Sequence, residues 1–128
     1  MSGWPELQWD TEPTGPLKGL KIVDMSTVVL GPFATVNFAD MGADVIKVEN
    51  GEGKFAGDMM RHAGDSPTGD LGPIFSSLNR NKKSVTLNGK DDDDKAVILE
   101  LLKHADVFFH NVRLAGMARL GLDYESVK

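Results

Sequence analysis

The sequence contains no cysteine among its 128 residues. Disulfide bonds, thiolate catalysis and zinc held by cysteine are therefore excluded, and a reducing cytoplasm is an acceptable compartment. No apolar run approaches the roughly 20 residues that a membrane-spanning helix needs. The N-terminus also lacks the basic segment and apolar core of a secretory signal. We therefore expect a cytoplasmic protein that does not cross a membrane.

The sequence also has fewer basic than acidic residues, with 14 lysines and arginines against 19 aspartates and glutamates. The net charge is −5 and the isoelectric point is near 5.1, which argues against nucleic acid as a partner because a phosphate backbone requires a basic face. With 41% hydrophobic and 26% charged residues, the composition is that of one globular domain rather than of a disordered chain.

The familiar nucleotide and catalytic motifs are absent too. A dinucleotide site needs a G-x-G-x-x-G loop after its first strand, whereas Met25 to Ala34 offers only Gly31. Without those glycines, Glu49 is interpreted as a strand-end charge rather than a ribose ligand. No Walker loop, nucleophile elbow or His-Glu-x-x-His motif is present, so we predict no catalytic residue and no metal site within this chain.

What the sequence does contain is a strand, helix and strand between Gly19 and Glu49. The β-branched run from Lys21 to Met25 suits a strand buried in a parallel sheet. Pro32 is typical of the first residue of a helix, whose apolar surface would include Phe33, and Gly42 is a helix stop. Two strands joined by such a helix should lie parallel, with ligands bound beyond their carboxyl ends.

The remaining chain continues this α/β pattern. We expect residues 1–18 to form an extended arm carrying Trp4 and Trp9, and residues 50–73 a long functional loop. The further predicted elements are a short apolar element at 74–78, a strand at 84–87, a helix at about 91–105, a buried strand at 106–110 and a short helix at 117–122. Asp91 to Asp94 are interpreted as compensating the helix dipole, with a metal site as the weaker alternative.

Cations and amides follow several of these strands. If the fold gathers them at one edge of the sheet, they could hold a phosphorylated ligand through charge-assisted hydrogen bonds. These residues are Arg80, Lys82, Lys83, Lys90, Asn111, Arg113 and Arg119.

Three blocks of the sequence resemble the N-terminal part of the class III CoA-transferases, the family of formyl-CoA transferase, the carnitine CoA-transferases and α-methylacyl-CoA racemase. They are GLKIVDMSTVVLGPFAT…ADMGADVIKVE (19–49), LNRNKKSVTLNGK (78–90) and ADVFFHNVRLAGMARLGLDYE (105–125). Residues 19–128 would then be the N-terminal part of a Rossmann-like CoA-binding domain with flanking helices, truncated at its C-terminus.

The resemblance also implies site residues. The loop that lines the CoA and active-site cleft would be Thr27, Val28, Val29 and Leu30. The residues that contact coenzyme A elsewhere would be Leu87 and Lys90 at the nucleotide portion, Asn111 and Val112 at the strand end, and Arg119 at a phosphate. Val112 stands where the family usually has phenylalanine, and Asn50 stands where many members have arginine.

The activity implied is transfer of CoA between an acyl-CoA thioester and a carboxylic acid, by an interlocked homodimer whose catalytic aspartate lies beyond Lys128. The chain alone is therefore expected to be inactive. Two alternatives stay open: a fragment of an acyl-CoA racemase, and a non-catalytic CoA-binding or assembly module.

Overall fold

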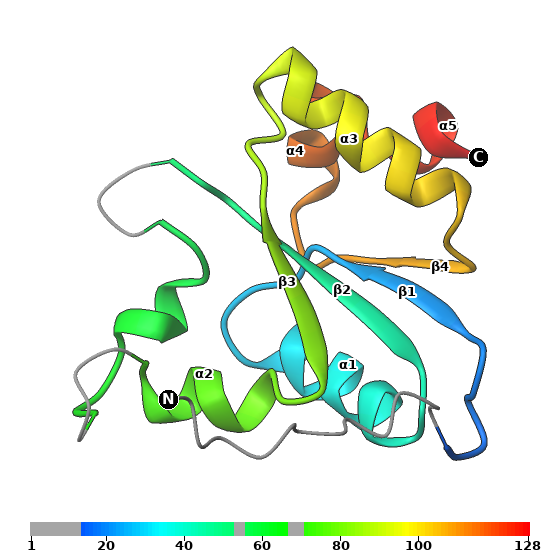
Figure 1. Ribbon diagram of the computed structural model, residues 1–128. Helices are drawn as coiled ribbons and strands as arrows, with labels where there is room; N and C mark the ends of the chain where they lie inside the picture. Colours follow the sequence, from blue (N-terminus) through cyan, green and yellow to red (C-terminus); the bar gives the residue numbers. More distant parts are fainter. Residues whose placement is uncertain (1–13, 53–55, 67–70) are drawn as a thin grey trace, which may run out of the picture.

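The structure is a computed structural model that describes residues 14–52, 56–66 and 71–128. Within them, four strands form one sheet in the order β3-β2-β1-β4, and every neighbouring pair is parallel (Figure 1). The strands are β1 (Lys21–Asp24), β2 (Asp44–Glu49), β3 (Lys82–Thr86) and β4 (Val107–Phe109). The predicted α/β fold with a parallel sheet and flanking helices is confirmed.

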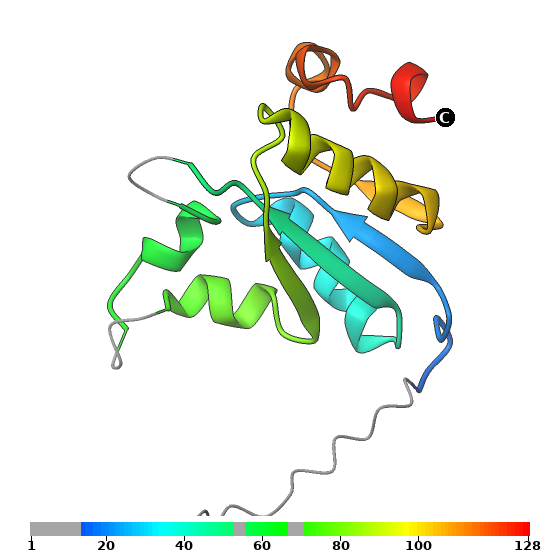
Figure 2. The same cartoon turned by 45° about the horizontal axis from the view of Figure 1, so that its top comes forward.

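Helices connect these strands in chain order. They are α1 (Leu30–Asp40), the 3-10 helix η1 (Met59–His62), α2 (Pro73–Leu78), α3 (Asp92–Lys103), α4 (Leu114–Leu120) and α5 (Tyr124–Val127). Figures 1 and 2 place α3, α4 and α5 on one side of the sheet and α1 on the other. The helix η1 lies inside the predicted long loop, so part of that loop has regular structure.

Each face of the sheet has its own apolar core. On one face, Val23 and Val48 pack against Ile98 of α3 and Met117 of α4. On the other, Ile22 and Val45 pack against Ala39 of α1. Because successive strand residues point to opposite faces, neighbouring residues of β1 enter different cores. This two-sided burial holds the two central strands, β1 and β2, in place.

Helix α1 differs from the prediction at its start and on its surface. It begins at Leu30, so Pro32 is its third residue; the first-turn N–H groups have no intrahelical partner, which is why proline is tolerated there. Phe33 was expected on the packed face but is 55% exposed, whereas the polar Thr35 is fully buried. The prediction for Phe33 was wrong because the sheet covers the face of α1 that carries Thr35, Val36 and Ala39, and a residue two positions from Thr35 lies on nearly the opposite face of a helix.

The two later elements also differ in detail. The strand predicted as buried at 106–110 is the edge strand β4, whose residues are only half-buried because no neighbour lies beyond it within the described residues. Helix α4 begins at Leu114 rather than Met117, and ends as predicted at Gly121, which has a left-handed φ of 69°.

The N-terminus of α3 and the chain before β1 are held by specific hydrogen bonds. Asp91 caps α3 by accepting hydrogen bonds from the backbone N–H groups of Asp93 and Asp94, as the dipole interpretation expects. Leu17 donates its backbone N–H to the Met41 carbonyl, at 3.0 Å, beside the end of α1. Trp4 and Trp9 of the predicted arm lie outside the described residues, so the arm and the boundary at residue 19 stay predictions.

Candidate functional site

The carboxyl ends of the strands meet at one edge of the sheet, where their connections border a cleft of about 200 Å³. Met25 and Thr27 come from the segment after β1, and Asn50 follows β2. The other wall comes from the segment after β3, from Val112 before α4, from Leu120 at the end of α4, and from Val48 of β2. The complete lining is Met25, Thr27, Val48, Asn50, Leu87, Asn88, Gly89, Lys90, Val112 and Leu120. The cleft thus lies where parallel sheets bind ligands.

Four of the nine predicted site residues line this cleft, although they come from three separate segments of the chain. They are Thr27, Leu87, Lys90 and Val112. Leu87 is buried and belongs to the core beneath the cleft, whereas Lys90 is exposed. The cleft therefore combines an apolar floor with an ammonium group at its rim.

The other five predicted residues do not line the cleft. Val29 and Leu30 are 45% and 81% exposed at the start of α1. Arg119 is exposed and donates from Nε to the Ala115 carbonyl at 3.2 Å. Val28 and Asn111 lie next to the cleft, because both are joined to its lining residue Thr27. Contact with a ligand stays a prediction for all nine residues.

Asn111 is bonded to the backbone of Thr27 from both sides of its amide. Its Oδ1 accepts from the Thr27 N–H at 3.0 Å, and its Nδ2 donates to the Thr27 carbonyl at 2.8 Å. The segment after β4 thereby holds the segment after β1, in the manner of a neighbouring strand. The side chain predicted to hold a ligand is thus engaged with the protein itself.

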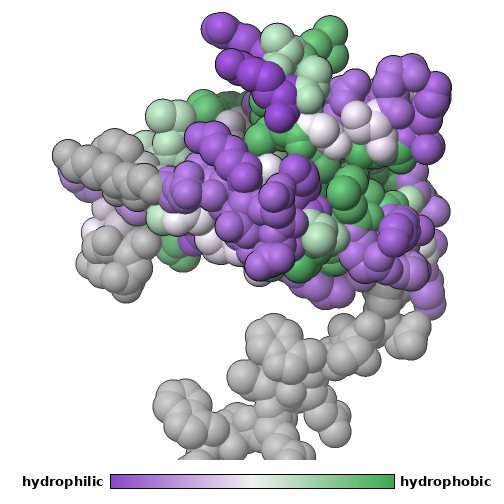
Figure 3. Space-filling view, turned by 90° about the horizontal axis from the view of Figure 1, so that it is seen from above, coloured by the Kyte–Doolittle hydropathy of each residue, from purple (hydrophilic) through white to green (hydrophobic). Residues whose placement is uncertain are grey.

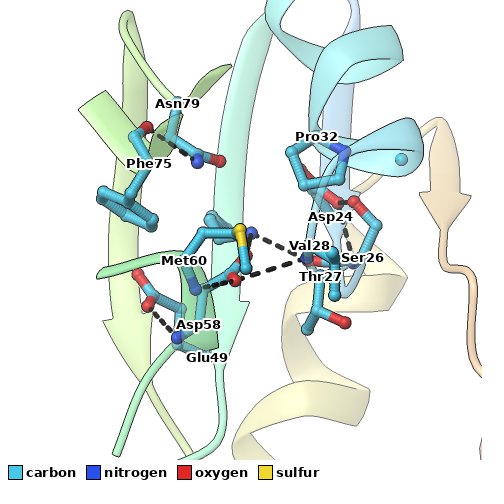
Figure 4. Close-up of polar contacts among 12 residues, drawn as sticks. Asp24, Ser26, Thr27, Val28, Pro32, Glu49, Asp58, Met60, Phe75 and Asn79 are labelled. Atoms are coloured by element: carbon cyan, nitrogen blue, oxygen red, sulfur yellow. Dashed lines mark hydrogen bonds and ion pairs between the residues drawn. The ribbon is translucent and has the colours of Figure 1, made fainter. Parts of the chain in front are cut away.

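A buried carboxylate, Asp24, organises the loop behind the cleft. Its Oδ1 accepts from the Ser26 N–H at 2.9 Å, and its Oδ2 accepts from Thr35 Oγ1 at 2.6 Å and from Lys82 Nζ at 3.1 Å. Burial lowers the pKa of Lys82, while the charge of Asp24 acts in the opposite direction. Figure 4 shows Asp24 beside Ser26 and Pro32.

A second buried ion pair joins β2 to the segment before η1. Lys47 Nζ lies 3.0 Å from Asp58 Oδ2, and both side chains are at most 1% exposed. The same ammonium donates to the Ser26 carbonyl at 2.7 Å. Asp58 Oδ1 accepts from the backbone N–H of Met60 at 3.0 Å and of Val28 at 3.3 Å. One pair of charges therefore fixes three segments.

Glu49 is a buried carboxylate that pairs with the partly exposed Arg61. Its carboxylate accepts from Arg61 at 2.6 and 2.7 Å, from Ser84 Oγ at 2.6 Å and from the Asp58 N–H at 2.8 Å. The Arg61 guanidinium also lies 3.9 Å from the centre of the Phe75 ring. Glu49 is the last residue of β2, which agrees with its interpretation as a strand-end charge. Its burial was not predicted, and it arises because the long loop returns and supplies Asp58 and Arg61 as partners.

These contacts make the free energy of unfolding depend on pH. Burial acts to raise the pKa of Glu49, but the hydrogen bonds from Arg61, Ser84 and the Asp58 backbone outweigh burial and lower the pKa to about 2. Because this pKa lies below the ordinary value of 4.5, the stabilisation is complete above about pH 4.5 and is lost as the pH falls toward about 2.

We therefore expect Glu49→Gln to lower the free energy of unfolding at neutral pH and to flatten its decline between about pH 5 and about pH 2. Urea unfolding followed by circular dichroism across that range measures both effects. Glu125→Gln is the matched control, since Glu125 is an exposed carboxylate that pairs with Lys128, and this variant should keep the slope of the unchanged protein. Parallel slopes for Glu49→Gln and the unchanged protein would contradict the assignment.

The predicted gathering of cations at the binding edge is wrong for three of them. Lys82 and Lys83 begin β3, so their backbone lies at the amino end of that strand, and Arg80 precedes them. Lys83 pairs with Asp44 at 2.8 Å, Arg80 pairs with Asp40, and Lys82 is buried against Asp24. Their positions follow from the strand beginning two residues before the predicted Ser84.

Other site classes find no support in the described residues. No group of three or more histidine, aspartate or glutamate side chains there is arranged to hold a metal ion. None of the helices described is both long and apolar enough to cross a membrane.

Sequence reasoning missed the residues that support the cleft. Lys47 and Asp58 were not proposed, and their pairing connects positions that no local pattern relates. The one available signal was the alternation in β2, which places Lys47 on the same face as Val45 and Glu49. Burial of that whole face shows that its charges must find partners within the protein.

The fold and the cleft define a nucleotide-type α/β domain without a dinucleotide fingerprint. The sequence matches CoA-transferase family III over residues 17–128. The chain therefore belongs to that family.

Individual relatives agree with this assignment. The chain is 42% identical to the human succinyl-CoA:glutarate CoA-transferase and 41% identical to the acetyl-CoA:oxalate CoA-transferase of Acetobacter aceti, over 94% and 91% of its length. It covers only 27% and 29% of those proteins. A CAIB/BAIF family protein from Brucella suis has a similar structure, with a TM-score of 0.81, 36% identity, and coverage of 90% of this chain and 30% of that one.

Proposed function

We propose that this chain forms the coenzyme A cradle of an enzyme that transfers CoA between an acyl-CoA thioester and a carboxylic acid. The observation that carries the proposal is the cleft, because it brings together Thr27, Leu87, Lys90 and Val112 at the carboxyl edge of a parallel sheet. Membership of CoA-transferase family III supports the choice of ligand. Relatives that act on glutarate and oxalate by name support a carboxylic acid as the acceptor.

The chemistry of the cleft suits the nucleotide end of coenzyme A. Val48, Leu87 and Val112 provide apolar surface for an adenine ring or the pantetheine arm. Lys90 provides an exposed ammonium that can bind a phosphate group through charge-assisted hydrogen bonds. Asn50 adds an amide at the end of β2. Although the protein is acidic overall, Lys90 can therefore bind a small anion locally.

The proposed role of this chain is to bind coenzyme A and does not include the catalytic residue. The chain spans less than a third of the length of the relatives named above, and no complete catalytic constellation is found among its described residues. We propose that the nucleophilic aspartate lies in a part of the enzyme without a counterpart here, and that the enzyme is a cytoplasmic homodimer. Transfer of CoA by the isolated chain, measured with acyl-CoA donors and carboxylate acceptors, would refute the proposed location of the aspartate.

Racemisation of an acyl-CoA would use the same cradle, so it is the second candidate within this fold. The two activities differ in what changes: a transferase moves CoA to a second acid, whereas a racemase inverts the α-carbon of a single acyl-CoA. The names of the relatives cited favour transfer.

A calorimetric titration of the chain with coenzyme A tests the cradle. We expect saturable heat with CoA, and none with NAD, since the loop after β1 lacks the glycines that approach a pyrophosphate. A pure assembly module would give no saturable heat with either ligand. That result would overturn the proposed function.

A further inference from the structure

The segment after β1 contains a strained residue beside the cleft. Val28 has a φ of 72°, and a β-branched side chain rarely adopts this left-handed conformation because its Cβ crowds the following carbonyl. The surrounding structure must therefore impose the conformation. Val28 directly follows Thr27, which lines the cleft, so the direction of the chain at this point decides where Thr27 lies.

Two side chains from distant segments hold this turn. Asn111, after β4, binds both the N–H and the carbonyl of Thr27, at 3.0 and 2.8 Å. Asp58, before η1, accepts the N–H of Val28 at 3.3 Å. Figure 4 shows the Asp58 carboxylate between the Met60 backbone and Val28. The Thr27–Val28 turn is thus fixed on one side by a neutral amide and on the other by a carboxylate.

The carboxylate is itself immobilised. Lys47 Nζ lies 3.0 Å from its second oxygen, and neither side chain is exposed by more than 1%. Lys47 also binds the Ser26 carbonyl at 2.7 Å, one residue before the turn begins. Because a buried pair of this kind resists separation in the low dielectric of the interior, Asp58 cannot move away from Val28 at low cost.

We propose that Asn111 and Asp58 are positioning residues of the coenzyme A cleft: they hold Val28 in the left-handed conformation that keeps Thr27 at the wall of the cleft before any ligand binds. This inference rests on the proposed function, since it concerns the affinity of the same cleft. A turn held in advance lowers the ordering cost of binding. Glycine at position 28 adopts the same conformation without strain and should make both side chains dispensable.

The test measures CoA affinity in variants of the 128-residue chain. Asn111→Ala should weaken binding about tenfold, the size of effect that corresponds to the cost of a left-handed residue. Adding Val28→Gly should restore affinity to within about twofold of the unchanged protein. Asn37→Ala is the matched control: Asn37 is an exposed amide that donates to the Phe33 carbonyl within α1, and its removal should not change affinity.

Removing Asp58 alone would leave Lys47 as a buried unpaired charge, so the second variant replaces both. Lys47→Met with Asp58→Leu exchanges the ion pair for apolar side chains, which cores often tolerate, and removes the acceptor for the Val28 N–H. A similar loss of affinity is expected, again restored by Val28→Gly.

A ligand-free readout separates this inference from the proposed function. A positive φ brings the amide and α protons of one residue together, so Val28 should give a strong intraresidue NOE that weakens in Asn111→Ala. Loss of CoA affinity that Val28→Gly does not restore would mean that Asn111 contacts the ligand directly, and would overturn the positioning role. An unchanged NOE and unchanged affinity in Asn111→Ala would overturn it as well. An unchanged protein that shows the NOE but binds no CoA would refute the proposed function and leave the turn contacts standing.

Discussion

Replacing Asp24 by alanine is expected to lower the free energy of unfolding by about 3–5 kcal/mol, the usual cost of breaking a buried ion pair from one side. Asp24 is fully buried, and its removal leaves Lys82 Nζ without its carboxylate and Thr35 Oγ1 without its shortest hydrogen bond. The Ser26 N–H also loses its acceptor at 2.9 Å. Urea unfolding at neutral pH, with the slope checked for constancy, measures the loss.

Asp44→Ala is the matched control for this prediction. It removes the same number of atoms from an ion pair of the same sheet, but Lys83 and Asp44 are 69% and 43% exposed. Exposed pairs contribute about 0–1 kcal/mol because water screens them. The losses of unfolding free energy caused by the two aspartate substitutions should therefore differ several-fold. Equal losses for the two variants would show that burial does not decide the contribution of these pairs.

Reversing the charge of Lys90 is expected to have the largest effect on ligand binding. Lys90→Glu should weaken CoA binding about 30-fold or more, because a charge-assisted hydrogen bond contributes about 1.5–3 kcal/mol and the new carboxylate repels a phosphate. Lys90 is exposed at the rim of the cleft, so its replacement should leave the unfolding free energy nearly unchanged. Titration calorimetry at low salt, repeated at high salt, measures both the loss and its screening.

Lys103→Glu makes the same charge change on the last turn of α3, where Lys103 pairs with Glu100 and does not line the cleft. It should leave CoA affinity within about twofold. If Lys90→Glu and Lys103→Glu weakened binding to the same extent, the effect would come from net charge rather than from a contact in the cleft.

The elements of the fold that follow from local periodicity were predictable from the sequence. The strand, helix and strand from Gly19 to Glu49 formed as expected, since β-branched runs and a helix ended by Gly42 are properties of neighbouring residues. The parallel pairing of β1 and β2 followed from the length of their connection. Boundaries shifted at α1 and α4, where the first turn of a helix carries few local constraints.

The supporting contacts of the site could not be predicted in this way. Lys47 pairs with Asp58, eleven residues further along the chain, and Asp24 pairs with Lys82 although α1, β2, η1 and α2 lie between them. Each charged side chain, considered alone, is most often a solvated surface group. The left-handed φ of Val28 was equally hidden, because valine normally avoids that conformation and only tertiary contacts impose it.

The resemblance of the sequence to a family predicted more of the cleft than any single pattern did. Thr27, Leu87, Lys90 and Val112 come from three segments, yet all four line one hollow. The same resemblance did not reveal that the Asn111 amide is occupied by the Thr27 backbone, because a family motif identifies a position and not the partner that each atom binds.

A second hollow is the main alternative binding site for a ligand. It has a volume of about 350 Å³, and its lining includes Leu102 of α3, His110 directly after β4 and Tyr124 of α5. Figure 3, viewed from the side of α3, shows apolar residues gathered between hydrophilic borders on this face. Apolar surface of this kind can bind a ligand or another protein segment, so volume alone does not decide between the two hollows.

Mapping amide chemical-shift changes on addition of coenzyme A tests the central claim most directly. We expect the changes to concentrate at the cleft on the carboxyl edge of the sheet, at Thr27, Leu87, Lys90 and Val112, and to saturate together. Changes centred on Leu102, His110 and Tyr124, or no saturable change at any residue, would contradict it.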